Sequence, residues 1–129
     1  MRYLLDTHVL LWAATAPTRL TDETRALLED GTNDVFVSVV TGWEIAIKQS
    51  LAKLELSEPA ELWLPRVIAD SGFAIAELGL PAALRVRALP FHHRDPFDRL
   101  LIAQALQENF TVVTHDESFH AYGVSLLLT

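Results

Sequence analysis

Short apolar runs alternate with amphipathic stretches along the chain, and this alternation limits the possible folds more than any other feature. The short runs have the length and β-branched content of buried strands, whereas the longer stretches repeat apolar residues at helical spacing. Predicted strands cover residues 3–5, 35–38, 73–76, 111–114 and 124–128, and predicted helices cover 8–14, 22–30, 41–53, 57–70, a segment from 81, and 96–109. We therefore expect an α/β fold with a mostly parallel central sheet of about five strands, covered by helices on both faces.

The size and composition of the chain fit one domain that spans residues 1–129. No cysteine is present, which excludes disulfides and thiolate zinc sites. The apolar runs are shorter than the ~18 residues that a membrane span needs, and Asp6 interrupts the apolar N-terminus in a way that is not typical of a signal peptide. We expect a soluble protein of the cytoplasm that has no membrane partner.

The net charge of −7 argues against broad contact with nucleic acid, whose protein partners usually carry a basic surface. The charges are unevenly distributed, however. One segment combines four of the ten Lys and Arg residues with two histidines: Arg85, Arg87, His92, His93, Arg94 and Arg99. Such a segment is typical either of a solvated helix face and loop or of a surface that meets phosphates, and charge alone leaves both interpretations open.

Four acidic residues that are far apart in the sequence are predicted to meet at one edge of the sheet. Asp6 follows the first strand and Asp116 follows the fourth, at the strand ends where α/β proteins bind ligands. Glu44 and Asp98 are expected in the first turns of the third and sixth helices, which begin at that same edge. The sequence therefore predicts an acidic cluster.

Each acid also has an explanation that needs no active site. Asp6 can cap the following helix, Asp116 can lie in a turn, and Glu44 can pair with Lys48 on the surface. Asp98 is harder to explain in this way, because apolar residues at i+3, i+4 and i+7 place it on the buried face of its helix. A buried carboxylate must be paired, protonated or bound to a metal.

A cluster of carboxylates favours a divalent cation, because like charges repel one another unless a cation lies between them. Oxygen ligands suit Mg²⁺ or Mn²⁺, and these ions activate water and stabilise developing charge in phosphodiester hydrolysis. Bound cations would also offset part of the net negative charge. Asp95 is predicted to stand apart from the cluster, since an Asp before Pro96 is typical of a helix N-cap.

Four segments resemble the PIN-domain family, and more narrowly the VapC-type toxins of bacterial toxin–antitoxin pairs. They are LLDTHVLLW at residues 4–12, WEIAIK at 43–48, HRDPFDRLLIAQA at 93–105 and THD at 114–116. The segments occur in the family's order and span essentially the whole chain. Gly42 departs from the pattern, because relatives often have Ser or another residue there.

The resemblance implies a three-layer α/β/α fold and an Mg²⁺- or Mn²⁺-dependent endoribonuclease that is the toxin of a toxin–antitoxin pair. It assigns catalysis and metal binding to Asp6, Glu44, Asp98 and Asp116. Thr7 and Thr114 match hydroxyl residues that hydrogen bond to such acids. The resemblance also implies a homodimer and a small antitoxin protein that blocks the site. In the basic segment, the candidates for contact with RNA are Arg94, Arg99 and His93.

Other functions remain as alternatives. A catalytically inactive PIN-like binding module would share the fold, although the presence of all four acids does not favour it. A receiver-type phosphoacceptor domain would share the length and the α/β pattern. It would need an acidic pair near the first strand and a late lysine, whereas Thr7 follows Asp6 and the last lysine is Lys53. A dehalogenase-like phosphatase would need Asp where His8 stands.

Overall fold

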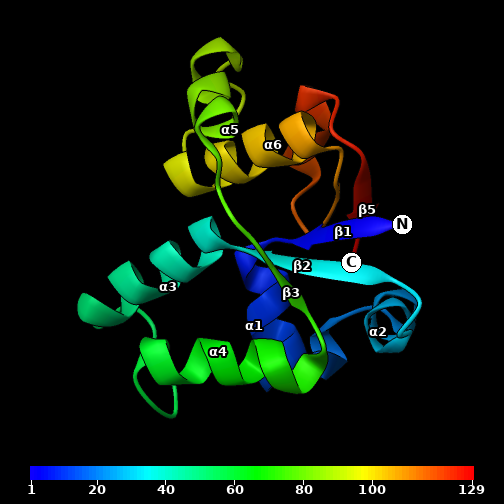
Figure 1. Ribbon diagram of the computed structural model, residues 1–129, viewed down its shortest axis with the longest axis vertical. Coiled ribbons are helices and arrows are strands. Elements are labelled where there is room, and N and C mark those ends of the chain that lie inside the picture. Colours follow the sequence, from blue (N-terminus) through cyan, green and yellow to red (C-terminus); the bar gives the residue numbers. More distant parts are fainter.

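The computed structural model describes residues 1–129 and contains a five-stranded parallel sheet with the order β3-β2-β1-β4-β5. The strands are β1 (Arg2–Leu5), β2 (Asp34–Ser38), β3 (Ala74–Ala76), β4 (Thr111–Thr114) and β5 (Leu126–Leu128). Helices lie on both sides of this sheet (Figure 1). The three-layer α/β/α fold that the sequence predicts is confirmed.

Six α-helices and three short 3-10 helices connect the strands. The α-helices are α1 (Thr7–Thr15), α2 (Asp22–Glu29), α3 (Val39–Ser50), α4 (Ala60–Ser71), α5 (Leu80–Arg85) and α6 (Pro96–Glu108). The 3-10 helices are η1 (Pro17–Arg19), η2 (Val86–Ala88) and η3 (Glu117–Tyr122). In Figure 1, α5 and α6 lie on one side of the sheet, and α1, α2 and α4 lie on the other. None of these helices has the length and apolar character needed to cross a membrane.

The sheet separates two apolar cores, and adjacent residues of a strand contribute to different cores. Leu4 and Val112 pack in the core that includes α6, whereas Leu5 and Val113 pack in the core that includes α1 and α4. Side chains of a strand point alternately to the two faces, so a strand covered on both faces must be apolar throughout. This requirement accounts for the unbroken apolar runs. Trp63 on α4 is buried in the second core.

The centre of the sheet determines where the acidic residues meet. β1 lies between β2 and β4, and Leu5 at its end is in register with Val37 of β2 and Val113 of β4. The segments that leave these three strands therefore begin side by side. Because parallel strands end at the same edge, polar residues that follow them gather there.

The third helix begins earlier than the sequence predicts. The predicted helix covers residues 41–53, but α3 begins at Val39 directly after β2 and ends at Ser50. The reason is a local cap, since the hydroxyl oxygen of Ser38 accepts a hydrogen bond of 3.0 Å from the Val40 N–H. As a consequence, Glu44 lies in the second turn of α3 and not in the first.

Two further boundaries differ from the sequence-based expectation by two or more residues. The fourth helix begins at Ala60 and not at residue 57, because Pro59 is its N-cap and has an extended backbone. The last strand begins at Leu126 and not at residue 124. Gly123 ends η3 with a φ of 70°, and Val124 after it packs into the core before the strand starts.

Candidate active site

The four predicted acids lie on segments that leave the carboxyl edge of the sheet. Asp6 follows β1 and is the N-cap of α1, and Asp116 follows β4 and is the N-cap of η3. Asp98 lies in the first turn of α6, and Glu44 lies in the second turn of α3. The negative charges of Asp6 and Glu44 both raise the pKa of Asp98, so these three carboxyl groups are close enough to interact.

Asp6 is buried, with 4% of its surface exposed, and both of its carboxyl oxygens accept hydrogen bonds. Oδ1 accepts from the Val9 N–H at 2.8 Å, and Oδ2 accepts from the Thr114 hydroxyl. Burial raises the pKa of Asp6 above its ordinary value, although these two hydrogen bonds and the nearby His8 and His115 oppose the shift. Asp6 thus combines the helix-capping role that the sequence allowed with a place in the acidic cluster.

Glu44 is 2% exposed and is held from two sides. Its Oε1 accepts a 2.6 Å hydrogen bond from the Thr7 hydroxyl, and its Oε2 lies 2.5 Å from Nζ of Lys48. The hydrogen bond to Glu44 raises the pKa of the Lys48 ammonium, although partial burial opposes the shift. The i,i+4 spacing revealed this ion pair in the sequence, but the expected surface pair turns out to involve a buried carboxylate.

His93 joins Asp98 to Asp116. Its Nε2 lies 3.1 Å from Oδ2 of each carboxylate, and its Nδ1 accepts a 3.1 Å hydrogen bond from the Asp95 N–H. An Nδ1 that accepts carries no proton, so the proton is on Nε2 and is shared between the two acids. His93 therefore acts as a hydrogen-bond donor in this arrangement. Its position five residues before Asp98 is the only signal of this role in the sequence.

Asp98 has a strongly perturbed carboxyl group. Burial, followed by the negative charges of Asp95, Asp6 and Glu44, raises the pKa of Asp98 to about 7, although His93 opposes the shift. A group with this pKa binds a proton or a cation readily near neutral pH. The Asp98 side chain is 23% exposed, so it is half-buried and not fully buried as the helical spacing predicts.

Asp116 is more exposed than Asp98, and its pKa moves in the opposite direction. Partial burial alone would raise the pKa of Asp116, but hydrogen bonds from Ser118 and His93 outweigh it and lower the pKa. The Ser118 contribution comes from its N–H and its hydroxyl, which both donate to Oδ1. Asp116 therefore remains ionised beside Asp98.

The oxygen atoms of this cluster suit a hard divalent cation. His93, Asp98 and Asp116 each offer one possible ligand atom, and these atoms lie within 4.8 Å of one another. Because Nε2 of His93 carries a proton, the carboxylates are the better ligands, and carboxylate oxygens suit Mg²⁺ or Mn²⁺. Asp95 is the N-cap of α6, as the sequence predicts: its Oδ1 accepts from the Phe97 and Asp98 N–H groups, and its negative charge raises the pKa of Asp98.

The basic residues near the site divide into exposed and buried ones. Arg94 is exposed on the segment before α6. Arg99 is 5% exposed, and its guanidinium donates to the carbonyl oxygens of Val86, Leu89 and Pro90. This burial argues against the direct RNA contact that the sequence suggested for Arg99, because its donors are already used within the protein.

A second set of side chains, which we call the ring ladder, flanks the acids on the α1 side. The ladder consists of His8, Trp12, His115 and Arg19. The ring centre of His115 lies 5.2 Å from that of His8 and 4.8 Å from that of Trp12. The Arg19 guanidinium lies 4.6 Å from the centre of the Trp12 ring. His8 and His115 are exposed, so aromatic and cationic groups border Asp6 and Asp116.

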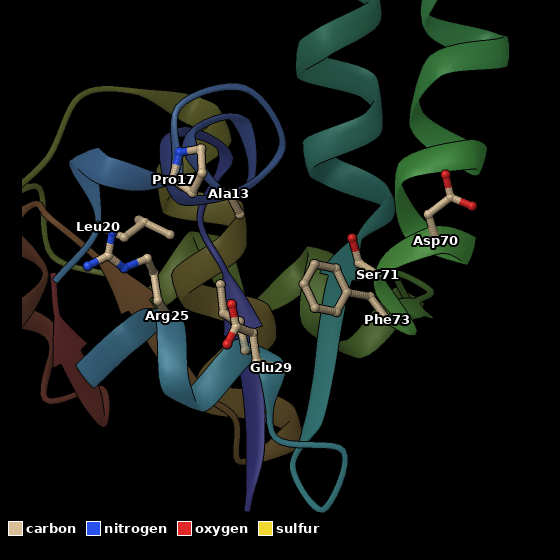
Figure 2. A pocket seen from close by; sticks show the side chains of 9 residues that line it. Ala13, Pro17, Leu20, Arg25, Glu29, Asp70, Ser71 and Phe73 are labelled. Atoms are coloured by element: carbon tan, nitrogen blue, oxygen red, sulfur yellow. The ribbon is translucent and has the colours of Figure 1, made fainter. Parts of the chain in front are cut away.

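The acidic cluster does not coincide with the cavity drawn in Figure 2. That cavity, of about 300 Å³, lies where Pro17, Leu20 and Arg25 on one side face Asp70 and Phe73 on the other. None of the four clustered acids lines it. The candidate active site is therefore a group of side chains at the sheet edge and not a deep pocket.

Comparison with known proteins identifies one family. The family model of the PIN domain matches residues 3–124 of this chain. Ribonuclease VapC22 of Mycobacterium tuberculosis is 26% identical over 119 residues, which cover 92% of this chain and 90% of that protein. Ribonuclease VapC16 of the same organism is 41% identical, but only over 44 residues.

Solved structures with the same fold come from several bacteria. VapBC2 from Rickettsia felis, bound to a DNA fragment from its promoter, superposes with a TM-score of 0.75 at 18% identity and covers 99% of this chain and 98% of that chain. FitAcB from Neisseria gonorrhoeae superposes with a TM-score of 0.64 at 24% identity. The match covers 97% of this chain and 96% of that chain. At these identities the likeness shows a common fold.

Proposed function

Because this chain belongs to the PIN domain family, we propose that it is a ribonuclease whose activity depends on a divalent cation held by four carboxylates. The acids are Asp6, Glu44, Asp98 and Asp116. The observation that carries the proposal is the environment of Asp98, whose pKa rises to about 7 through burial and neighbouring negative charges. Such repulsion within a cluster is relieved when a divalent cation binds.

The residues fit a cation of the size and hardness of Mg²⁺ or Mn²⁺. Asp98 and Asp116 direct oxygens toward a common proton on His93, so a cation that binds both competes with this N–H. Both oxygens of Glu44 are already bonded, which favours contact with the cation through water. When bound, the cation would supply an activated water and stabilise charge on the phosphate.

The support for RNA as the substrate comes from two sources. A relative that aligns over nine-tenths of the chain, VapC22, bears the name ribonuclease. The ring ladder adds exposed aromatic and cationic groups beside the acids, and single-stranded nucleic acids bind such groups through stacking and charge. A cation and these groups would let an acidic protein bind a polyanion locally.

We also propose that the protein is the toxin of a toxin–antitoxin pair. Solved structures that share its fold include the VapBC complexes. The partner would be a small antitoxin that covers the acids, and the toxin itself would form a homodimer in the cytoplasm. Co-expression with the product of an adjacent small gene tests the partnership, because the two proteins should co-purify and RNA cleavage should be suppressed.

The activity is tested by incubating purified protein with RNA in Mg²⁺, in Mn²⁺ and in EDTA. We expect cleavage with either cation, none in EDTA, and recovery when the cation is restored. A protein that binds RNA but never cleaves it would instead be a non-catalytic PIN-like binding module. Cleavage that is as fast in EDTA as in Mg²⁺ would rule out the proposed dependence on a divalent cation.

A further inference from the structure

Phe91 is an exposed aromatic residue on the segment that enters the candidate active site. It is 85% exposed, the largest value among the exposed large apolar side chains. Two residues later, His93 contacts Asp98 and Asp116. Two residues of chain span at most about 7 Å, so Phe91 lies at the rim of the acidic cluster.

The ring of Phe91 rests on a buried cation. The Arg99 guanidinium lies 4.3 Å from the ring centre and is held below it by hydrogen bonds to main-chain carbonyl oxygens, including a 2.8 Å bond to Pro90. No carboxylate lies within ion-pair distance of Arg99. A cation against one face of an aromatic ring is attracted to it, so this contact favours a ring orientation that leaves the other face to solvent.

Tyr122 connects this pair to the acids. Its hydroxyl oxygen accepts a hydrogen bond of 3.3 Å from Nη1 of Arg99 and one of 2.7 Å from the His93 N–H. Tyr122 is buried in the core next to α6. Hydrogen bonds through Tyr122 therefore join the buried cation to the histidine at the acids, and the cation–π contact joins the exposed ring to that cation.

We propose that Phe91 is a stacking platform for an unpaired RNA base next to the phosphate that is cleaved. This inference rests on the proposed ribonuclease function and adds that the substrate must be single-stranded at this position. A ring whose orientation the Arg99 contact already favours loses less freedom when a base stacks on it, and stacking requires a base that is not paired. The uncompensated charge of Arg99 also favours a polyanion at this rim.

The surroundings of Phe91 favour a nucleotide over a protein partner. Its neighbours in the sequence, His92 and Arg94, are exposed and polar. A protein interface needs a contiguous apolar centre, whereas Phe91 stands among polar and cationic groups. The exposed apolar residues Val39, Trp43 and Ile75, by contrast, line one shared groove elsewhere on the molecule.

The test measures binding of a fluorescent, unstructured RNA of about 12 nucleotides, a typical length for single-strand sites, with Ca²⁺ in place of Mg²⁺ to prevent cleavage. Fluorescence anisotropy gives Kd for the wild type and for Phe91→Ala, Phe91→Leu and Phe91→Trp. Leu84→Ala is the matched control, since Leu84 on α5 is also exposed, at 65%. Melting temperatures check that every variant folds.

We expect Phe91→Ala and Phe91→Leu to weaken binding by about 5- to 100-fold, which corresponds to the loss of one stacked base. Phe91→Trp should bind at least as well as the wild type, Leu84→Ala should be unchanged, and annealing the RNA to its complement should remove the effect of Phe91→Ala.

Two results would contradict the proposal that a base stacks on Phe91 but would not contradict the proposed ribonuclease activity. One is a Phe91→Leu variant that binds like the wild type. The other is a Phe91→Ala variant that loses self-association or antitoxin binding but keeps RNA affinity. If the wild type neither binds nor cleaves RNA, the proposed function fails, and the platform fails with it.

Discussion

Asp98 illustrates how single residues set the properties of this site. Its carboxyl group lies on the buried face of α6, among the charges of Asp95, Asp6 and Glu44, and its pKa rises to about 7. A carboxyl group with a raised pKa binds its proton more tightly in the folded chain than in the unfolded chain. Its contribution to stability is therefore complete below the ordinary pKa and is lost as the pH rises through about 7.

From this we predict that Asp98→Asn stabilises the metal-free protein at alkaline pH. The amide removes a partly buried charge, so the free energy of unfolding of the variant relative to the wild type should rise by about 2–3 kcal/mol between pH 5 and pH 8. Urea unfolding in EDTA at a series of pH values measures this difference. Parallel pH curves for the two proteins would show that Asp98 is not perturbed.

At this scale the sequence predicts some residues and misses others. Apolar residues at helical spacing correctly indicate that Asp98 faces the interior, and the Asp before Pro96 correctly indicates a cap. The bridge made by His93 is not predicted, because it depends on the path of an irregular segment that has no periodicity. The burial of Arg99 is missed for a related reason, since the carbonyl groups that bind it come from that same region.

Among the elements, α3 is the one whose start does most to position the site. Ser38 ends β2 and caps α3 with no intervening loop, and its hydroxyl also donates a 2.5 Å hydrogen bond to Oε1 of the buried Gln104 on α6. Gln104 in turn donates to the carbonyl oxygens of Ala76 and Glu77. This network joins α3, α6 and the end of β3 behind the acids.

We predict that Ser38→Ala lowers the free energy of unfolding by about 2–3 kcal/mol. The loss of a cap costs about 1 kcal/mol, and the unpaired buried oxygen of Gln104 adds to it. Thr21→Ala is the comparison, because the exposed Thr21 caps α2 by accepting from the Thr24 N–H and also donates to the buried Thr24 hydroxyl. Denaturant unfolding measures both variants, and a loss of only about 1 kcal/mol for Ser38→Ala, the value of a cap alone, would mean that the Gln104 bond contributes nothing.

The sequence predicts the elements themselves better than their ends. Continuous apolar runs identify the parallel strands, because burial on both faces leaves no room for polar residues. The ends depend on single side chains such as the hydroxyl of Ser38 or the ring of Pro59. These side chains move the start of a helix by two or three residues from the position that the apolar periodicity predicts. Strand order and register also require the structure, since they arise from contacts between distant segments.

The whole molecule carries a net charge of −7, which must be reconciled with the proposed binding to RNA. In that proposal the acids hold a cation, and without a cation carboxylates repel phosphate. The basic and aromatic groups surround these acids on two sides, with the ring ladder next to α1 and Phe91 with Arg94 before α6. The proposed RNA binding therefore depends on the local distribution of charge more than on the net charge.

We predict that RNA binding requires a divalent cation. Replacing Ca²⁺ by EDTA at constant ionic strength should weaken binding of unstructured RNA by about tenfold or more, because the unscreened carboxylates then face the phosphates. Anisotropy titrations measure both values of Kd. An affinity that is the same in Ca²⁺ and in EDTA would indicate that the RNA does not approach the acids.

The most direct measurement compares RNA cleavage by the wild type, Asp98→Asn and Asp95→Asn in Mg²⁺. Each substitution removes one carboxylate from the start of α6, but Asn keeps the helix cap at residue 95. We predict that Asp98→Asn reduces the cleavage rate at least about 100-fold, as loss of a group that stabilises developing charge does, whereas Asp95→Asn stays within a few-fold of the wild type. Equal cleavage by Asp98→Asn and the wild type would contradict the claim that these carboxylates hold the catalytic cation.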